Sequence, residues 1–180
     1  MSADILTRKY EKAFLLYDHD GDGIVDQADL RQIQDQFLLA FGAADSEKGA
    51  VVRERWDDFW AALTSAIDSD LDDRLTREEF VGGMRQLSVG EAADFDAVFR
   101  PLVEAIFTLM DSDSSGVVTD EEFRQFQAGI GNADQADAAL AKIDRDGDGV
   151  LTLDEMTADI REYLTSDDPE NSNNWFLGEV

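Results

Sequence analysis

The sequence predicts an all-α protein built from four helix–loop–helix units, arranged as two paired lobes that pack into one compact unit. Three observations support this prediction. An acidic twelve-residue segment recurs four times in register along the 180 residues. Apolar residues follow helical spacing on both sides of these segments, and the eighth position of every segment is apolar. A single copy could be an ordinary acidic turn, but recurrence of the whole pattern argues against that alternative.

The first segment, Asp18–Asp29, follows a helix predicted from the spacing of Tyr10, Phe14 and Tyr17. Its oxygen-bearing positions one, three, five, seven and twelve are Asp18, Asp20, Asp22, the carbonyl of Ile24, and Asp29. This alternation of carboxylates and carbonyl suits a hard divalent cation. Aspartate at position twelve reaches less far than glutamate and eases six-coordinate geometry, so we expect Mg²⁺ to compete with Ca²⁺ at this first loop.

The region from Phe41 to Ile67 is long enough for an additional helix before the second segment. Trp56, Phe59 and Trp60 recur in it at helical spacing. This pattern favours an enlarged hydrophobic core over a ligand pocket, although spacing alone leaves both open.

The second segment, Asp68–Glu79, keeps its acidic ligands but departs from the pattern elsewhere. Its candidate ligands are Asp68, Asp70, Asp72, the carbonyl of Arg74, and Glu79. Asp73 stands at position six, where the turn requires positive φ, and Leu71 stands at position four. We therefore expect either a strained functional loop or a degenerate loop retained for pairing, and three or four bound Ca²⁺ ions in total.

The junction between the two halves contains Pro101 within an apolar stretch. Because proline suits the first turn of a helix and disrupts its middle, we expect a helix break near Arg100 and a new helix starting at Pro101. The connection is short, so we expect the two lobes to pack together.

The third and fourth segments, Asp111–Glu122 and Asp144–Glu155, contain the ligand pattern in full. The candidate ligands of the third are Asp111, Asp113, Ser115, the carbonyl of Val117, and Glu122. Those of the fourth are Asp144, Asp146, Asp148, the carbonyl of Val150, and Glu155. Gly149 supplies positive φ at position six without the cost of about 1–2 kcal/mol that a side chain imposes.

The eighth positions are Val25, Leu75, Val118 and Leu151. A strand of two or three residues is not stable alone, so we expect the first loop to pair with the second and the third with the fourth. The predicted organisation is an N-terminal pair over 1–90 with an enlarged inter-loop helical region, a C-terminal pair over 91–164, and a tail over 165–180. We expect the apolar residues Trp175, Phe176 and Leu177 to pack that tail on the core, rather than leave it disordered or free for a partner.

Composition limits the function further. The formal net charge is −26, from 41 acidic and 15 basic residues, which argues against nucleic-acid binding. Cysteine is absent, which removes disulfides and thiolate metal sites. The sequence has no apolar run near 20 residues and no signal-peptide pattern at its start, so we expect a soluble, cytoplasmic protein without a membrane partner. We expect a monomer; a protein partner is compatible with the sequence but not indicated by it.

These motifs resemble those of the EF-hand superfamily over nearly the whole chain. The unequal loop spacing, the junction Phe99-Arg-Pro-Leu-Val-Glu and the Asn-Trp-Phe-Leu-Gly tail resemble calerythrin and the sarcoplasmic calcium-binding proteins. The resemblance implies a compact, intracellular calcium buffer in which the second loop is often inactive. The acidic ligands of the second loop are more complete here than the resemblance implies.

Buffering of Ca²⁺ is therefore the leading functional hypothesis, and a Ca²⁺ sensor that regulates a partner is the main alternative. Sensors expose adaptable, methionine-rich grooves, whereas this chain has four Met against eleven Phe and three Trp. A chromophore-binding relative is disfavoured because the single histidine, His19, stands at position two of the first loop and should face solvent. An enzyme is not indicated, since no histidine is available as a general base beside a nucleophile and no phosphate-binding Gly-rich loop is present.

Overall fold

The computed structural model describes residues 4–129 and 133–168, in which helices predominate. The helices are α1 (Ile5–Tyr17), α2 (Gln27–Ala40), α3 (Glu47–Ile67), α4 (Arg77–Val89), α5 (Ala92–Met110), α6 (Asp120–Gly129), α7 (Ala136–Ile143) and α8 (Leu153–Thr165), with a 3₁₀ turn, η1, at Ala133–Gln135. The strands are β1 (Ile24–Val25), β2 (Leu75–Thr76), β3 (Val118–Thr119) and β4 (Val150–Leu151). Each acidic segment joins two successive helices, which confirms the four predicted helix–loop–helix units.

The residues at positions nine and twelve of each loop start the helix that leaves it. In α2, α4 and α8 they form a reciprocal capping box, in which the side chain of each residue accepts the backbone N–H of the other. The pairs are Asp26 with Asp29, Thr76 with Glu79, and Thr152 with Glu155. Thr119 and Glu122 make the same two bonds at the start of α6. The loop sequence therefore fixes where each exiting helix begins.

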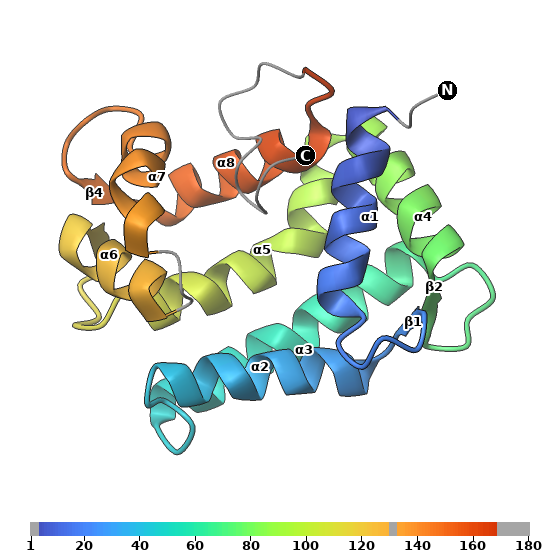
Figure 1. The fold of residues 1–180 in the computed structure, drawn as a ribbon, viewed down its shortest axis with the longest axis horizontal. Coiled ribbons are helices and arrows are strands. Elements are labelled where there is room, and N and C mark those ends of the chain that lie inside the picture. Colours follow the sequence, from blue (N-terminus) through green and yellow to red (C-terminus); the bar gives the residue numbers. More distant parts are fainter. Residues whose placement is uncertain (1–3, 130–132, 169–180) are drawn as a thin grey trace.

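The short strands pair as the sequence predicts. Strand β1 is antiparallel to β2 with Val25 opposite Leu75, and β3 is antiparallel to β4 with Val118 opposite Leu151. All four of these eighth-position side chains are fully buried. The two loop pairs lie at opposite ends of the molecule, β1 and β2 beside α1 and α4, and β4 beside α7 (Figure 1).

One hydrophobic core unites the two halves, which confirms the compact arrangement. Its buried side chains form a single cluster drawn from helices before and after the junction. Helices α3 and α5 pack along one another at its centre (Figure 1). The aromatic residues Trp56, Phe59 and Trp60 of α3 are buried there, and the Phe59 ring lies 5.7 Å from that of Phe99 on α5. The inter-loop helix therefore enlarges the core, as its apolar spacing predicted.

The predicted helix break at Pro101 is wrong, because α5 continues through this residue from Ala92 to Met110. A proline inside a helix removes one backbone hydrogen bond and crowds the preceding turn, and Figure 1 shows α5 changing direction along its length. Burial of Val98, Phe99, Leu102 and Val103 on either side holds both segments against the core. Tertiary packing therefore outweighs the local cost of the proline.

Helix α4 ends at Val89 and α5 begins at Ala92, so only two residues join the predicted halves. The expected docking of Trp175, Phe176 and Leu177 falls outside the described residues. Among the helices that the structure describes, none combines the length and apolar character needed to cross a bilayer.

Candidate metal sites

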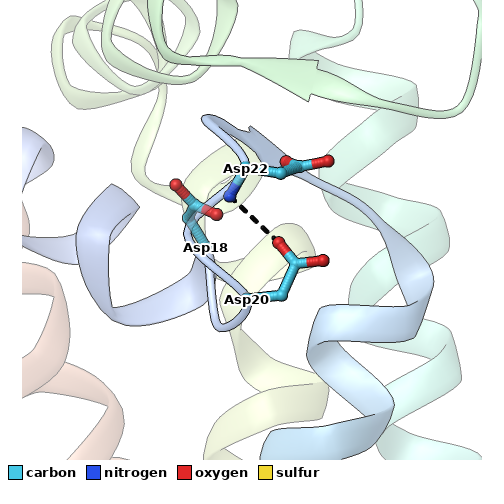
Figure 2. Close-up of side chains that lie close together, drawn as sticks. All are labelled: Asp18, Asp20 and Asp22. Atoms are coloured by element: carbon cyan, nitrogen blue, oxygen red, sulfur yellow. Dashed lines mark hydrogen bonds between the residues drawn. The ribbon is translucent and has the colours of Figure 1, made fainter.

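Each of the four loops brings three carboxylates together. In every group, one oxygen from each residue lies within 4.8 Å of the other two. The groups are Asp18, Asp20 and Asp22; Asp68, Asp70 and Glu79; Asp111, Asp113 and Glu122; and Asp144, Asp146 and Glu155. Figure 2 shows the first group gathered around the bend of its loop, where the Asp22 amide donates to Asp20 Oδ1 at 3.0 Å. Carboxylate oxygens at this density are the donor set that Ca²⁺ and Mg²⁺ prefer.

The aspartate at position one is oriented in the same way in all four loops. Its Oδ2 accepts the backbone N–H of position six, which folds the loop back on itself. The donor and acceptor pairs are Gly23 to Asp18 at 3.0 Å, Asp73 to Asp68 at 2.9 Å, Gly116 to Asp111 at 3.1 Å, and Gly149 to Asp144 at 3.1 Å. The second loop therefore reaches the same turn as the others despite its different sixth residue.

Positions five and seven are tied together by a second recurrent bond, in which the position-seven N–H donates to the position-five side chain. The pairs are Ile24 to Asp22 at 2.9 Å, Arg74 to Asp72 at 2.9 Å, Val117 to Ser115 at 3.4 Å, and Val150 to Asp148 at 3.0 Å. The hydroxyl of Ser115 makes the longest of these bonds. Position seven lies at the start of a strand or directly before it in every loop.

Backbone strain separates the second loop from the others. Asp73 has φ of 60°, which confirms the predicted strain at position six, and Leu71 at position four has φ of 62°. The first and fourth loops carry glycine at both of these positive-φ positions, and the third carries Ser114 at position four with φ of 60°. A residue with a side chain pays about 1–2 kcal/mol in this region, so the second loop is the most strained of the four. The recurrence of glycine at position four in two loops is the sequence signal for this requirement.

The glutamates at position twelve of the second and third loops are held as carboxylates by donors from both ends of their loops. Hydrogen bonds from the Ser69 and Thr76 side chains and from the Thr76 amide lower the pKa of Glu79 to about 2. For Glu122, burial raises the pKa, but bonds from Thr119 and Ser112 outweigh it and bring the pKa to about 2. Both groups are therefore anionic at neutral pH and available to a cation.

The first loop differs at position twelve, as its shorter side chain predicts. Asp29 is buried, and its Oδ1 accepts the backbone N–H groups of His19 at 3.1 Å and Asp20 at 3.3 Å. The carboxylate group of this loop is formed by Asp18, Asp20 and Asp22, whereas the groups of the other loops include their glutamate. His19 is exposed, as expected, and does not enter the core.

Two observations test whether these loops suit a cation. Among the described residues, Asp18 Oδ1 is a buried carboxylate oxygen without a hydrogen-bond partner, and a bound cation would satisfy it. In the second loop, desolvation and the charges of Asp72, Glu79 and Asp68 raise the pKa of Asp70. Both the orphaned oxygen and the mutual repulsion fit a divalent ion, so the residues present suit Ca²⁺ or Mg²⁺.

Sequence reasoning missed two basic side chains that lie beside the loops. Arg74 of the second loop has its Nη2 3.9 Å from Oδ2 of Asp22 in the first loop. Lys48, at the start of α3, donates from Nζ to the backbone carbonyl of Asp111, where α5 leads into the third loop. Neither contact has a local sequence signal, because each joins residues far apart in the chain.

These loops are similar in sequence to those of known proteins. A model of the EF hand matches residues 11–34, 102–127 and 136–158, which contain the first, third and fourth loops. Calerythrin of Saccharopolyspora erythraea is 27% identical over 168 residues, which covers 91% of this chain and 94% of calerythrin.

Two solved structures share the fold. A calcium-binding protein of Streptomyces coelicolor, described for prokaryotic calcium-mediated regulation, superposes with a TM-score of 0.74 at 29% identity, covering 89% of this chain and 98% of that one. A sarcoplasmic calcium-binding protein from amphioxus gives a TM-score of 0.75 at 18% identity, covering 99% of this chain and 100% of that one. The second likeness concerns the fold alone.

Proposed function

Because this chain is a calcium-binding EF-hand protein, we propose that it acts as a cytoplasmic, monomeric Ca²⁺ buffer that also takes Mg²⁺ at its first loop. The observation that supports ion binding most strongly is the grouping of three carboxylates within 4.8 Å in each of four loops. The loops supply the ligands, and the paired strands hold them two by two. We expect three or four ions per chain, with the second loop the weakest site.

The packing of the exiting helices favours a buffer over a sensor. Phe126 on α6 lies 5.0 Å from the ring of Phe41, which follows α2, and the two rings are nearly parallel. Phe37 on α2 lies 6.2 Å from the Phe126 ring and 5.9 Å from that of Trp56 on α3. This aromatic stack joins the helices that leave the first and third loops, so opening either loop would separate well-packed rings.

The methionines support the same conclusion. Met84, Met110 and Met156 are all buried in the core cluster. A sensor exposes such side chains in a flexible groove when calcium binds. Here the stiff aromatic residues dominate the interior, which favours closed packing.

A calcium sensor that regulates a partner is the second candidate. The Streptomyces coelicolor relative is described for calcium-mediated regulation. This chain also exposes apolar side chains on α1 and α2, namely Leu15 at 71%, Leu16 at 53% and Leu39 at 70% exposure. A groove that opens with calcium would distinguish a sensor from a buffer.

Calorimetric titration with Ca²⁺ tests the proposed ion binding, and substitution of the strained positions tests the ranking of the loops. We expect Leu71→Gly combined with Asp73→Gly to raise the Ca²⁺ affinity of the second loop by on the order of tenfold. The strained backbone lowers the population of the binding-competent loop, and glycine removes a cost of about 1–2 kcal/mol per position, less the entropy that glycine itself adds. The third and fourth loops should titrate as before.

The reciprocal control is Gly149→Asp. It gives position six of the fourth loop the aspartate that Asp73 provides at position six of the second loop. A Cβ at Gly149 meets no atom within 4 Å and φ there is positive, so a Cβ clash does not contribute and the expected loss of affinity reflects backbone strain. An unchanged second-loop affinity in the double variant would show that strain does not weaken this site. Repeating the wild-type titration in millimolar Mg²⁺ should weaken the first loop most.

A further inference from the structure

Lys9 is a fully buried cation that the ion-binding loops do not use. It lies on α1, and its Nζ donates to the backbone carbonyls of Tyr163 at 2.6 Å and Ser166 at 2.8 Å. The same Nζ lies 4.8 Å from the centroid of the Tyr163 ring. The next residue, Tyr10, is also fully buried and donates from its hydroxyl to the carbonyl of Leu164 at 2.6 Å. Helix α1 therefore binds the carboxyl end of α8.

The last carbonyls of a helix lack partners within the helix and carry the negative end of its dipole. Helix α8 has no basic residue in its own last turn. Lys9 and Tyr10 donate to carbonyls at this end of α8 from another helix. Burial lowers the pKa of Lys9, and the charges of Asp167 and Glu162 counter this effect only in part.

The contact between α1 and α8 lies between the first and the fourth loop, which do not pair with each other through their strands. Helix α1 ends at Tyr17, directly before Asp18 of the first loop, and α8 carries Glu155 of the fourth loop in its first turn. The strands pair the first loop with the second and the third with the fourth. The Lys9 and Tyr10 bonds are therefore a separate route between the two halves.

We propose that Lys9 is a positioning residue that couples ion binding at the fourth loop to ion binding at the first. The inference rests on the proposed binding of Ca²⁺ at both loops. Glu155 belongs to the carboxylate group of the fourth loop and also caps the start of α8, so an ion bound there would hold this end of the helix more firmly. The carboxyl end of α8 then holds α1 through Lys9 and Tyr10, so the first loop binds with a smaller ordering cost.

The coupling is measured by a double-mutant cycle read at individual loops. The amides of Gly23, Gly116 and Gly149 each donate to the first aspartate of their own loop, so their NMR signals report each loop separately during a Ca²⁺ titration. When Lys9 is present, Glu155→Gln should abolish tight Ca²⁺ binding at the fourth loop, which the Gly149 amide reports. It should also weaken the Ca²⁺ affinity of the first loop, which the Gly23 amide reports, by about fivefold or more. With Lys9→Met, the effect of Glu155→Gln on Gly23 should fall below about twofold.

Two controls separate coupling from general damage. The third loop pairs with the fourth through β3 and β4, so Gly116 should respond to Glu155→Gln whether or not Lys9 is present. Arg8→Met removes an exposed cation from the neighbouring position and should leave the coupling intact. Tyr10→Phe removes only one hydroxyl; it should reduce the coupling, and it provides a second test if Lys9→Met fails to fold.

Coupling that persists undiminished in Lys9→Met, or in Tyr10→Phe where Lys9→Met does not fold, overturns the proposal. In the unmodified protein, Ca²⁺-dependent shifts of the Gly23 and Gly149 amide signals would show that both loops bind Ca²⁺, even if the coupling through Lys9 fails. A failure of both amides to respond to Ca²⁺ in the unmodified protein would remove the proposed function and the coupling together. The two failures are therefore distinguishable in one titration series.

Discussion

Removal of Ca²⁺ by a chelator is expected to lower the midpoint of thermal unfolding by on the order of 20 °C. Each ion present at about 100 times its dissociation constant stabilises the folded chain by about 2.7 kcal/mol, so three occupied loops contribute about 8 kcal/mol. For a chain of this size, each kcal/mol corresponds to roughly 2–4 °C. The carboxylate groups, within 4.8 Å of one another in a chain of net charge −26, repel each other until a cation is bound.

Circular dichroism melting curves in Ca²⁺, in Mg²⁺ and in chelator measure this effect. The curve in Mg²⁺ should fall between the other two, because only the first loop is expected to bind Mg²⁺ as well as Ca²⁺. Adding 1 M NaCl to the chelated protein should recover a minor part of the loss, since salt screens repulsion without coordinating the carboxylates. Superimposable curves in Ca²⁺ and chelator would contradict ion-coupled stability.

The second large effect is expected at Gly83 on α4, where alanine should destabilise the fold by about 3 kcal/mol. A Cβ at this position would lie 2.3 Å from Ile67 Cβ and 2.5 Å from Ile67 Cγ2, and 3.2 Å from the Ile67 Cα. Part of this clash is with backbone, so rotation of the isoleucine side chain cannot relieve it. Ile67 ends α3 directly before Asp68, so the second loop should lose its geometry first.

The preceding residue, Gly82, provides a matched control in the same helix. A Cβ there meets no atom within 4 Å, so Gly82→Ala should stabilise the chain by about 0.5–1 kcal/mol through helix propensity. Urea unfolding monitored by tryptophan fluorescence compares the two midpoints under the same conditions. Equal midpoints for the two variants would show that the close approach of α4 to α3 is not restrictive.

The local architecture could be predicted from the sequence because each loop encodes its own geometry. The carboxylates at odd positions, the apolar eighth position and the twelfth-position acid are all separated by fixed short spacings. The pairing of the first loop with the second through Val25 and Leu75, and the strained turn at Asp73, followed from these local rules and are confirmed. The aromatic spacing of α3 likewise predicted a buried helix.

The features that sequence reasoning missed depend on the tertiary fold. The continuity of α5 through Pro101 depends on packing that no local pattern contains. The bonds of Lys9 to the end of α8, and of Lys48 to Asp111, join residues that are distant in the chain. The strain at Leu71 is different, because the glycines at position four of the first and fourth loops indicate that this position needs positive φ. It was recognised only from the backbone angle of Leu71 in the structure.

In the proposed buffer, the loops bind Ca²⁺ while the aromatic core stays closed. Fluorescence of a hydrophobic probe, recorded during a Ca²⁺ titration whose stoichiometry is measured by equilibrium dialysis, tests both parts together. We expect three or four bound ions per chain, with probe fluorescence that stays constant or falls as the ions bind. A strong rise in probe fluorescence on saturation would rule out the closed buffer and favour a sensor, and a chain without bound ions would rule out both.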